Sequence, residues 1–144
     1  MRIALAVAVL ALAAPAAAAK TPLPGIRTPS GNISSFYVPG RPAVLQCQIK
    51  QASYSQKLVD YCGSPPIQVD WGGFSLGPAK KGGITCRGGV LYDPGTQRLV
   101  FRTLAYGKTW RAGVFTCTSR TRGLTCTNRT GHGLFVSRES WRGW

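Results

Sequence analysis

Short stretches of strand-like composition, separated by turn residues, run along most of this chain. Their separators are rich in Gly and Pro, as at Pro39-Gly40 and Gly82-Gly83. This spacing predicts an all-β fold, a small antiparallel sandwich or barrel of about eight short strands with little helix. Only residues 52–61 have a pattern that fits a helical turn or two. The expected strands are 32–38, 43–49, 67–76, 89–92, 98–104, 112–118, 124–128 and 134–140.

One expected hairpin is marked by the turn sequence Asp93-Pro94-Gly95-Thr96. Aspartate commonly opens a β-turn, proline presets φ, and glycine accepts the position that requires positive φ. We therefore expect a turn here, with strands 90–92 and 98–101 on its two sides.

A second expected hairpin joins residues 115–118 to residues 124–127. If Thr121 and Arg122 form its loop, Cys117 lies directly opposite Cys126, within disulfide reach. The same register places threonines opposite one another on either side of the cysteines. A Cys117–Cys126 disulfide is the expected result.

The N-terminus has the pattern of a secretory signal peptide at residues 1–19. Arg2 precedes an apolar run over residues 3–14, and Ala17 and Ala19 form an Ala-x-Ala end. The run is shorter than the ~20 residues that a membrane-spanning helix needs. We expect residues 20–31, which are rich in Pro and Gly, to form an extended lead-in, and residues 32–144 to form a single β domain. The protein is then secreted, extracellular or periplasmic, and soluble after cleavage.

The net charge indicates which kind of partner the protein binds, and the cysteine content indicates the compartment in which it works. The chain has 18 Lys and Arg against 4 Asp and Glu, a net charge of +14. Such a field favours anionic partners, such as a cell-surface polymer or polysaccharide, and would bind nucleic acid only non-specifically. All 5 cysteines follow the predicted signal peptide, and in an exported chain they favour disulfides. With one histidine, a metal site is not expected.

Several strings in the chain resemble a family of exported bacterial proteins of unknown function. They are Ser30-Gly31-Asn32-Ile33, Cys126-Thr127-Asn128, and Gly131-His132-Gly133 followed by Phe135 and Ser137-Arg138. The resemblance covers nearly the whole mature chain. It implies an exported β domain with cysteine bridges, and it implies no activity.

The family pattern usually has a cysteine two residues after Ile33, where this chain has Ser35. If that cysteine would have paired with Cys47 across neighbouring strands, Cys47 is left without a partner. The resemblance thus implies a Cys62–Cys86 disulfide beside Cys117–Cys126. Cys47 is then either a free thiol or the link between two chains, and five cysteines leave at least one unpaired in any case.

Catalytic and cofactor patterns are weak. His132 lies between two glycines, which favours a turn over a general base. Asp70 next to Trp71 fits a sugar-binding groove, although a strand-end residue that bonds backbone is the simpler interpretation. The glycine pairs fit no phosphate-binding or dinucleotide-binding motif. We expect no enzyme and no cofactor, with a hydrolase that uses His132 or Asp70 as an alternative.

Two segments, residues 106–111 and 138–144, interleave aromatic and basic residues. This combination suits stacking on sugars or bases beside anionic groups. We therefore expect a non-catalytic binding or envelope-associated module for anionic polymers. The first alternative, ahead of the hydrolase, is an inhibitor or partner of an exported enzyme. The expected ligand-binding residues are Tyr106, Lys108, Trp110, Arg111, His132, Arg138 and Trp141.

Overall fold

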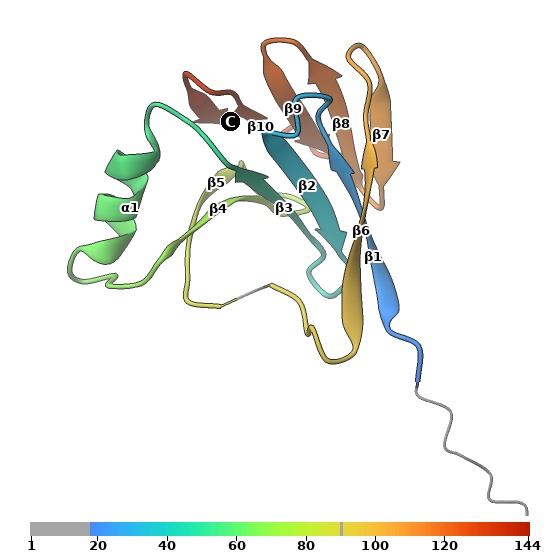
Figure 1. Cartoon of the computed structure of the whole chain (residues 1–144), viewed down its shortest axis with the longest axis horizontal. Helices are drawn as coiled ribbons and strands as arrows, with labels where there is room; N and C mark the ends of the chain where they lie inside the picture. Colours follow the sequence, from blue (N-terminus) through green and yellow to red (C-terminus); the bar gives the residue numbers. More distant parts are fainter. Residues whose placement is uncertain (1–17, 90) are drawn as a thin grey trace, which may run out of the picture.

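A computed structural model describes residues 18–89 and 91–144, which form two β-sheets that pack face to face (Figure 1). The strands of sheet A are β1 (Thr21–Arg27), β2 (Ile33–Val38), β3 (Val44–Ile49), β4 (Trp71–Leu76), β5 (Gly83–Cys86) and β6 (Gln97–Thr103). The strands of sheet B are β7 (Thr109–Ala112), β8 (Phe115–Arg120), β9 (Gly123–Asn128), β10 (Gly133–Val136) and β11 (Trp141–Gly143). Their spatial orders are β5-β4-β3-β2-β1-β6 and β11-β10-β9-β8-β7. The predicted disulfide-stapled all-β fold is confirmed; of the two forms expected it is the sandwich, with eleven strands among the described residues where about eight were expected.

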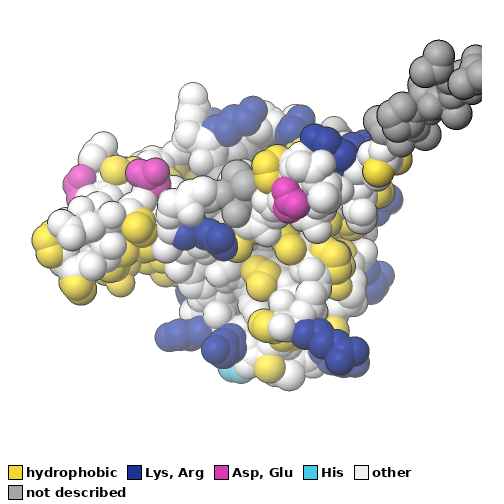
Figure 2. Space-filling model, turned by 90° about the horizontal axis from the view of Figure 1, so that it is seen from below, with side chains coloured by type: hydrophobic (Ala, Val, Ile, Leu, Met, Phe, Trp, Pro, Cys, Tyr) yellow, Lys and Arg dark blue, Asp and Glu magenta, His cyan; other side chains and the backbone are white. Residues whose placement is uncertain are grey.

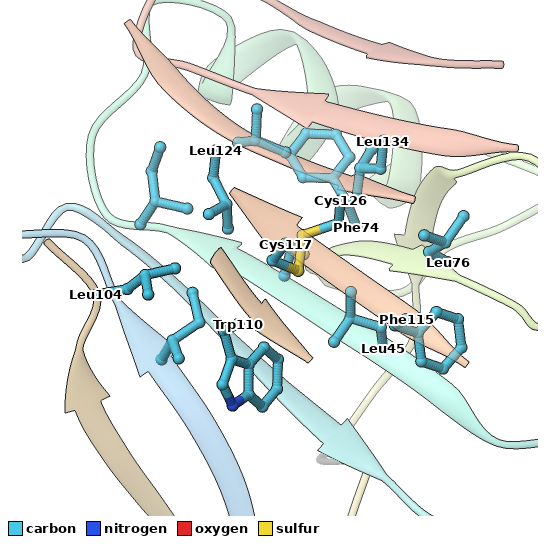
Figure 3. Packing of buried hydrophobic residues seen from close by; sticks show 14 of the residues in the cluster. Leu45, Phe74, Leu76, Leu104, Trp110, Phe115, Cys117, Leu124, Cys126 and Leu134 are labelled. Carbon is cyan, nitrogen blue, oxygen red and sulfur yellow. A yellow bond between two sulfur atoms is a disulfide. The ribbon is translucent and has the colours of Figure 1, made fainter. Parts of the chain in front are cut away.

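A single hydrophobic cluster lies between the two sheets, because alternate side chains of each strand point inward. Sheet A contributes Leu45, Phe74 and Leu76, and sheet B contributes Phe115 and Leu124 among others (Figure 3). The Cys117–Cys126 disulfide lies inside this cluster. The two cysteines are directly paired, and Arg120 pairs with Gly123, so the two-residue loop is as expected.

The predicted lead-in is part of the domain. Residues Thr21–Arg27 form β1, which pairs with β6 along its whole length and with β2 from Gly25 onward. Pro22 and Pro24 fall in the half of the strand that β2 does not pair, where a residue without an N–H group is tolerated. The β1–β6 pairing is parallel, whereas we expected an antiparallel arrangement throughout.

The turn at Asp93 is present, but the hairpin expected around it is not. The amide of Gln97 donates to the carbonyl of Asp93 at 2.7 Å, and the amide of Gly95 donates to its side chain at 2.8 Å. Leu91 and Tyr92 are not in a strand, and Val90 lies outside the described residues. β6 pairs instead with the distant β1.

The expected helical segment forms α1 (Ser55–Gly63), which lies beside β4 (Figure 1). Its buried Cys62 forms a disulfide with Cys86 on β5, as the resemblance implied. This bond ties the helix to the edge of sheet A.

Cys47 is free and fully buried. Ser35 is its direct partner across β2 and β3, and Ser35 Oγ lies 2.8 Å from Cys47 Sγ. A disulfide between two chains through Cys47 would require the sandwich to open, so the structure argues against that link.

The predicted signal peptide lies outside the described residues except for its last two positions. Among the residues that the structure describes, no helix is long and apolar enough to cross a membrane.

Candidate functional site: the outer face of sheet B

The strands β8 and β9 both contain the sequence Thr-Cys-Thr, and the alternation of a strand sends its middle residue inward. Cys117 and Cys126 are buried, while the flanking threonines are only half-buried. The threonines therefore lie on the outer face of sheet B. Pairing of neighbouring strands continues these positions into two rows that cross the sheet. One row is Thr109, Thr118, Thr125, Phe135 and Arg142; the other is Arg111, Thr116, Thr127 and Gly133.

We call the residues of these two rows, together with Arg122 and Trp144, the basic face. Threonine hydroxyl groups line the basic face, and Thr109 Oγ1 on the edge strand β7 lies 3.0 Å from Thr118 Oγ1 on β8. Exposed arginines stand at its margins, at positions 111, 122 and 142. No acidic residue belongs to either row.

The part of the chain that builds sheet B carries little negative charge. Residues 104–144 contain seven Lys and Arg, and Glu139 is the only acid among them. Figure 2 shows Lys and Arg side chains on both the upper and the lower parts of the molecule in that view, and acidic side chains only on its upper half. A surface with charges of one sign attracts anionic polymers at long range.

An aromatic platform lies at the β10–β11 side of the basic face. The Trp144 ring covers Gly133 so closely that a β-carbon at Gly133 would overlap it. The guanidinium carbon of Arg142 is 5.1 Å from the centroid of the Trp144 ring, a cation–π arrangement. Together with Phe135, Arg122 and Trp141, these residues line an open hollow of about 620 Å³. Aromatic faces beside guanidinium groups can stack on sugar rings and contact anionic substituents.

A second hollow, of about 250 Å³, lies at the β8–β9 hairpin end of sheet B. It brings together Tyr106 and Arg138, two of the residues expected from the sequence, and Arg122 lines both hollows. Glu139 also contributes to its lining.

Tyr54 fixes the turn that carries Arg138. Its hydroxyl donates to the carbonyl of Ser137 at 2.8 Å. Burial, and secondarily the negative charge of Glu139, raise the pKa of Tyr54 to about 12. The phenol therefore stays protonated and keeps donating this hydrogen bond at any ordinary pH.

The other residues expected from the sequence are dispersed. Trp110 is 4% exposed and packs in the core opposite Cys117, because its position in β7 points inward; it has no face for a surface ligand. Trp141 is half-buried, with its ring centroid 5.0 Å from that of Phe74. Lys108 is exposed where β7 begins, and Arg111 lies on the basic face.

His132 lies in the turn between β9 and β10. Its amide donates to Asn128 Oδ1 at 3.1 Å, and its carbonyl accepts from the amide of Asn128 at 2.9 Å. The same Asn128 side chain donates to the carbonyls of Gly77 and Lys80, so this turn anchors the loop after β4.

Sequence reasoning missed Arg122, Arg142, Phe135 and Trp144 as members of one surface. A usable signal was present, because inward cysteines in two Thr-Cys-Thr strands require outward threonines. Joining those strands to β10 and β11 required the pairing register, which the sequence does not contain. Within residues 18–89 and 91–144, no three His, Cys, Asp or Glu side chains gather as metal ligands would.

These features define a class: a two-sheet β sandwich with two internal disulfides, one α-helix among the described residues, and a basic outer face on its smaller sheet. The chain matches a family of unknown function, DUF6636, over residues 4–142, and it belongs to that family. No curated protein matches the chain, and no solved structure matches it.

Proposed function

We propose that this protein is a non-catalytic binding module that attaches to an anionic surface polysaccharide or a similar sugar-containing polymer through the basic face. The proposal rests on one observation: hydroxyl rows, arginines and an aromatic platform share a single outer surface without an acidic residue. Threonine hydroxyls suit hydrogen bonds to sugar hydroxyls, and arginines suit carboxylate or phosphate groups. The Trp144 and Phe135 rings add stacking surface.

The site of action we propose is outside the cytoplasm. Two disulfides within one small domain fit an oxidising compartment, and so does the N-terminal pattern of a signal peptide.

The test is retention of the mature protein on an acidic polysaccharide and on DNA, each titrated with salt. Binding to DNA through charge alone falls steeply with salt as counterions are released. We expect retention on the polysaccharide to persist at salt concentrations that abolish retention on DNA, since hydroxyl and stacking contacts are not screened.

A matched pair of triple variants locates the surface. The first variant changes Arg111, Arg122 and Arg142 to Gln and so removes three charges from the basic face. The second changes Arg41, Lys57 and Arg98 to Gln and so removes three charges from other parts of the surface. We expect the first variant to weaken polysaccharide binding about 10- to 100-fold, because each lost arginine contact contributes about 0.5–1 kcal/mol to the binding free energy. The second variant should change the affinity less than about threefold.

Equal weakening by the two triples would show that only net charge matters and would overturn the assignment to this face. Lack of retention of the unaltered protein on either polymer at low salt would overturn the polymer-binding function itself.

A further inference from the structure

The outer face of sheet A carries a second apolar layer, separate from the core. Phe36 points away from the core and is 3% exposed, since the rings of Tyr92 and Phe101 pack against it. Its ring makes edge contacts with Tyr92 and Phe101, with centroids 6.0 and 6.4 Å apart. Leu23, also fully buried and outside the core cluster, belongs to the same side of β1 as Gly25, which faces the Phe101 ring.

A pocket of about 230 Å³ remains beneath this cover. Phe36, Leu91, Tyr92 and Leu99 supply its apolar walls, and Gln46 and Arg87 are among its polar residues. It is smaller than the ~300–1,000 Å³ typical of drug-sized ligands, so it suits a body of one or two fused rings. Gln48 and Gly72 line both this pocket and a neighbouring hollow that contains Arg27 and Lys50.

Gln46 is the polar group that marks this pocket as a binding site. Its side chain is 2% exposed, and its Nε2 donates to the carbonyl of Gly72 at 2.6 Å. That bond fixes the orientation of the amide, and the buried Oε1 has no hydrogen-bond partner among the described residues. A buried acceptor without a partner is costly, and a donor from a ligand in the pocket removes that cost.

The charges around the pocket select an anion. Arg87 lines the pocket itself, and Arg27 and Lys50 line the adjoining hollow. Within the described part of the chain, neither lining contains an Asp or Glu residue. A carboxylate entering from the hollow therefore meets only positive charge.

We propose that this pocket binds a small organic anion with a flat apolar body and one N–H or O–H donor. The body lies against Phe36 and Leu99, the donor bonds to Gln46 Oε1, and the anionic group points toward Arg87, Arg27 and Lys50. This site lies on sheet A and is independent of the basic face on sheet B.

The test uses three probes that differ in one feature each. Indole-3-acetate carries a ring system, an N–H donor and a carboxylate. Its 1-methyl derivative lacks the donor, and indole-3-acetamide lacks the charge. Binding to the ¹⁵N-labelled protein is followed by amide chemical shifts. We expect indole-3-acetate to bind with shifts at Gly72, Leu99 and their neighbours, and each of the other two probes to bind at least fivefold more weakly.

A Gln46→Met variant then removes the acceptor while keeping the side-chain length, and Gln56→Met on α1 serves as a remote control. In Gln46→Met the parent and the methyl derivative should bind equally, whereas in Gln56→Met the fivefold difference should persist. If Gln46→Met does not fold, the probe series on the unaltered protein still decides. Equal affinity of the parent and the methyl derivative, shifts confined to other surfaces, or no shifts at millimolar concentration would overturn the proposal.

Discussion

The residue opposite Cys47 determines whether this cysteine is a free thiol or part of a disulfide, and here that residue is Ser35. They are direct partners on adjacent strands, and both are fully buried. Ser35 Oγ also donates to the carbonyl of Gln46 at 3.0 Å, so the hydroxyl is satisfied without a disulfide. Cys117 and Cys126 occupy the same kind of directly opposed, inward-facing pair on β8 and β9, and there both residues are cysteine.

A Ser35→Cys substitution should therefore create a third disulfide, with Cys47. The atoms to be joined are already in contact, and closing a loop of this length stabilises a fold by about 2–4 kcal/mol. Thiol titration should find no free cysteine, and the urea midpoint should rise. Ser34→Cys is the matched control: its partner is Gln48, so it should add one free thiol and no stability. Two reduced thiols in the air-oxidised Ser35→Cys variant would contradict this prediction.

At the scale of single elements, local sequence patterns predicted the pairing of strands that are neighbours in the sequence. They did not predict the pairing of strands that are far apart in the sequence. The β8–β9 hairpin, its register and its disulfide followed from residues 115–127 alone. The β1–β6 pairing joins residues more than seventy positions apart, and nothing in Pro22 or Pro24 indicates a partner at such distance. Trp110 was misplaced because the sequence predicted no strand over residues 109–112, and a strand of only four residues gives little alternation by which to recognise it.

β4 depends on a bulge that only glycine permits. The pairing with β5 shifts between Trp71 and Phe74, and Gly73 within the bulge has φ of +98°. A β-carbon there would overlap the backbone carbonyl oxygen of Cys47. The same bulge presents the Gly72 carbonyl to Gln46.

We expect Gly73→Ala to destabilise the protein by at least about 2 kcal/mol, the sum of a left-handed backbone and a backbone overlap. Gly88→Ala is the control, because its β-carbon would meet nothing within 4 Å. Urea unfolding monitored by tryptophan fluorescence measures both. If Gly73→Ala were as stable as Gly88→Ala, the tight approach of β4 to Cys47 would be refuted.

At the scale of the whole molecule, one core joins both sheets, and Cys47 lies within it. Burial raises the pKa of the Cys47 thiol to about 12, and the hydrogen bond to Ser35 only partly opposes this shift. The folded protein therefore holds the neutral thiol, which is the unreactive form. The unfolded chain forms thiolate above about pH 8.5, so this group's contribution to stability is complete below that pH and is lost as pH rises toward 12.

Cys47 should consequently report on opening of the whole sandwich. At pH 8 we expect Ellman's reagent to react with it at least about a thousandfold more slowly in native protein than in denaturant, where one equivalent should react at once. Replacing Cys47 with Ala should leave no reactive thiol and a smaller loss of stability between pH 8 and 10. Rapid reaction of one equivalent under native conditions would show that the two sheets separate readily.

The inward cysteines and outward threonines of β8 and β9 have a consequence for diversification. In β8 and β9 the disulfide-bonded cysteines point to one side, and the threonines that we propose to contact the ligand point to the other. Substitutions of the outward threonines can therefore change which ligand is bound without altering the buried residues that stabilise the fold. Randomising Thr109, Thr116, Thr118, Thr125 and Thr127 would turn sheet B into a display surface for selecting new binders on an unchanged, disulfide-locked frame.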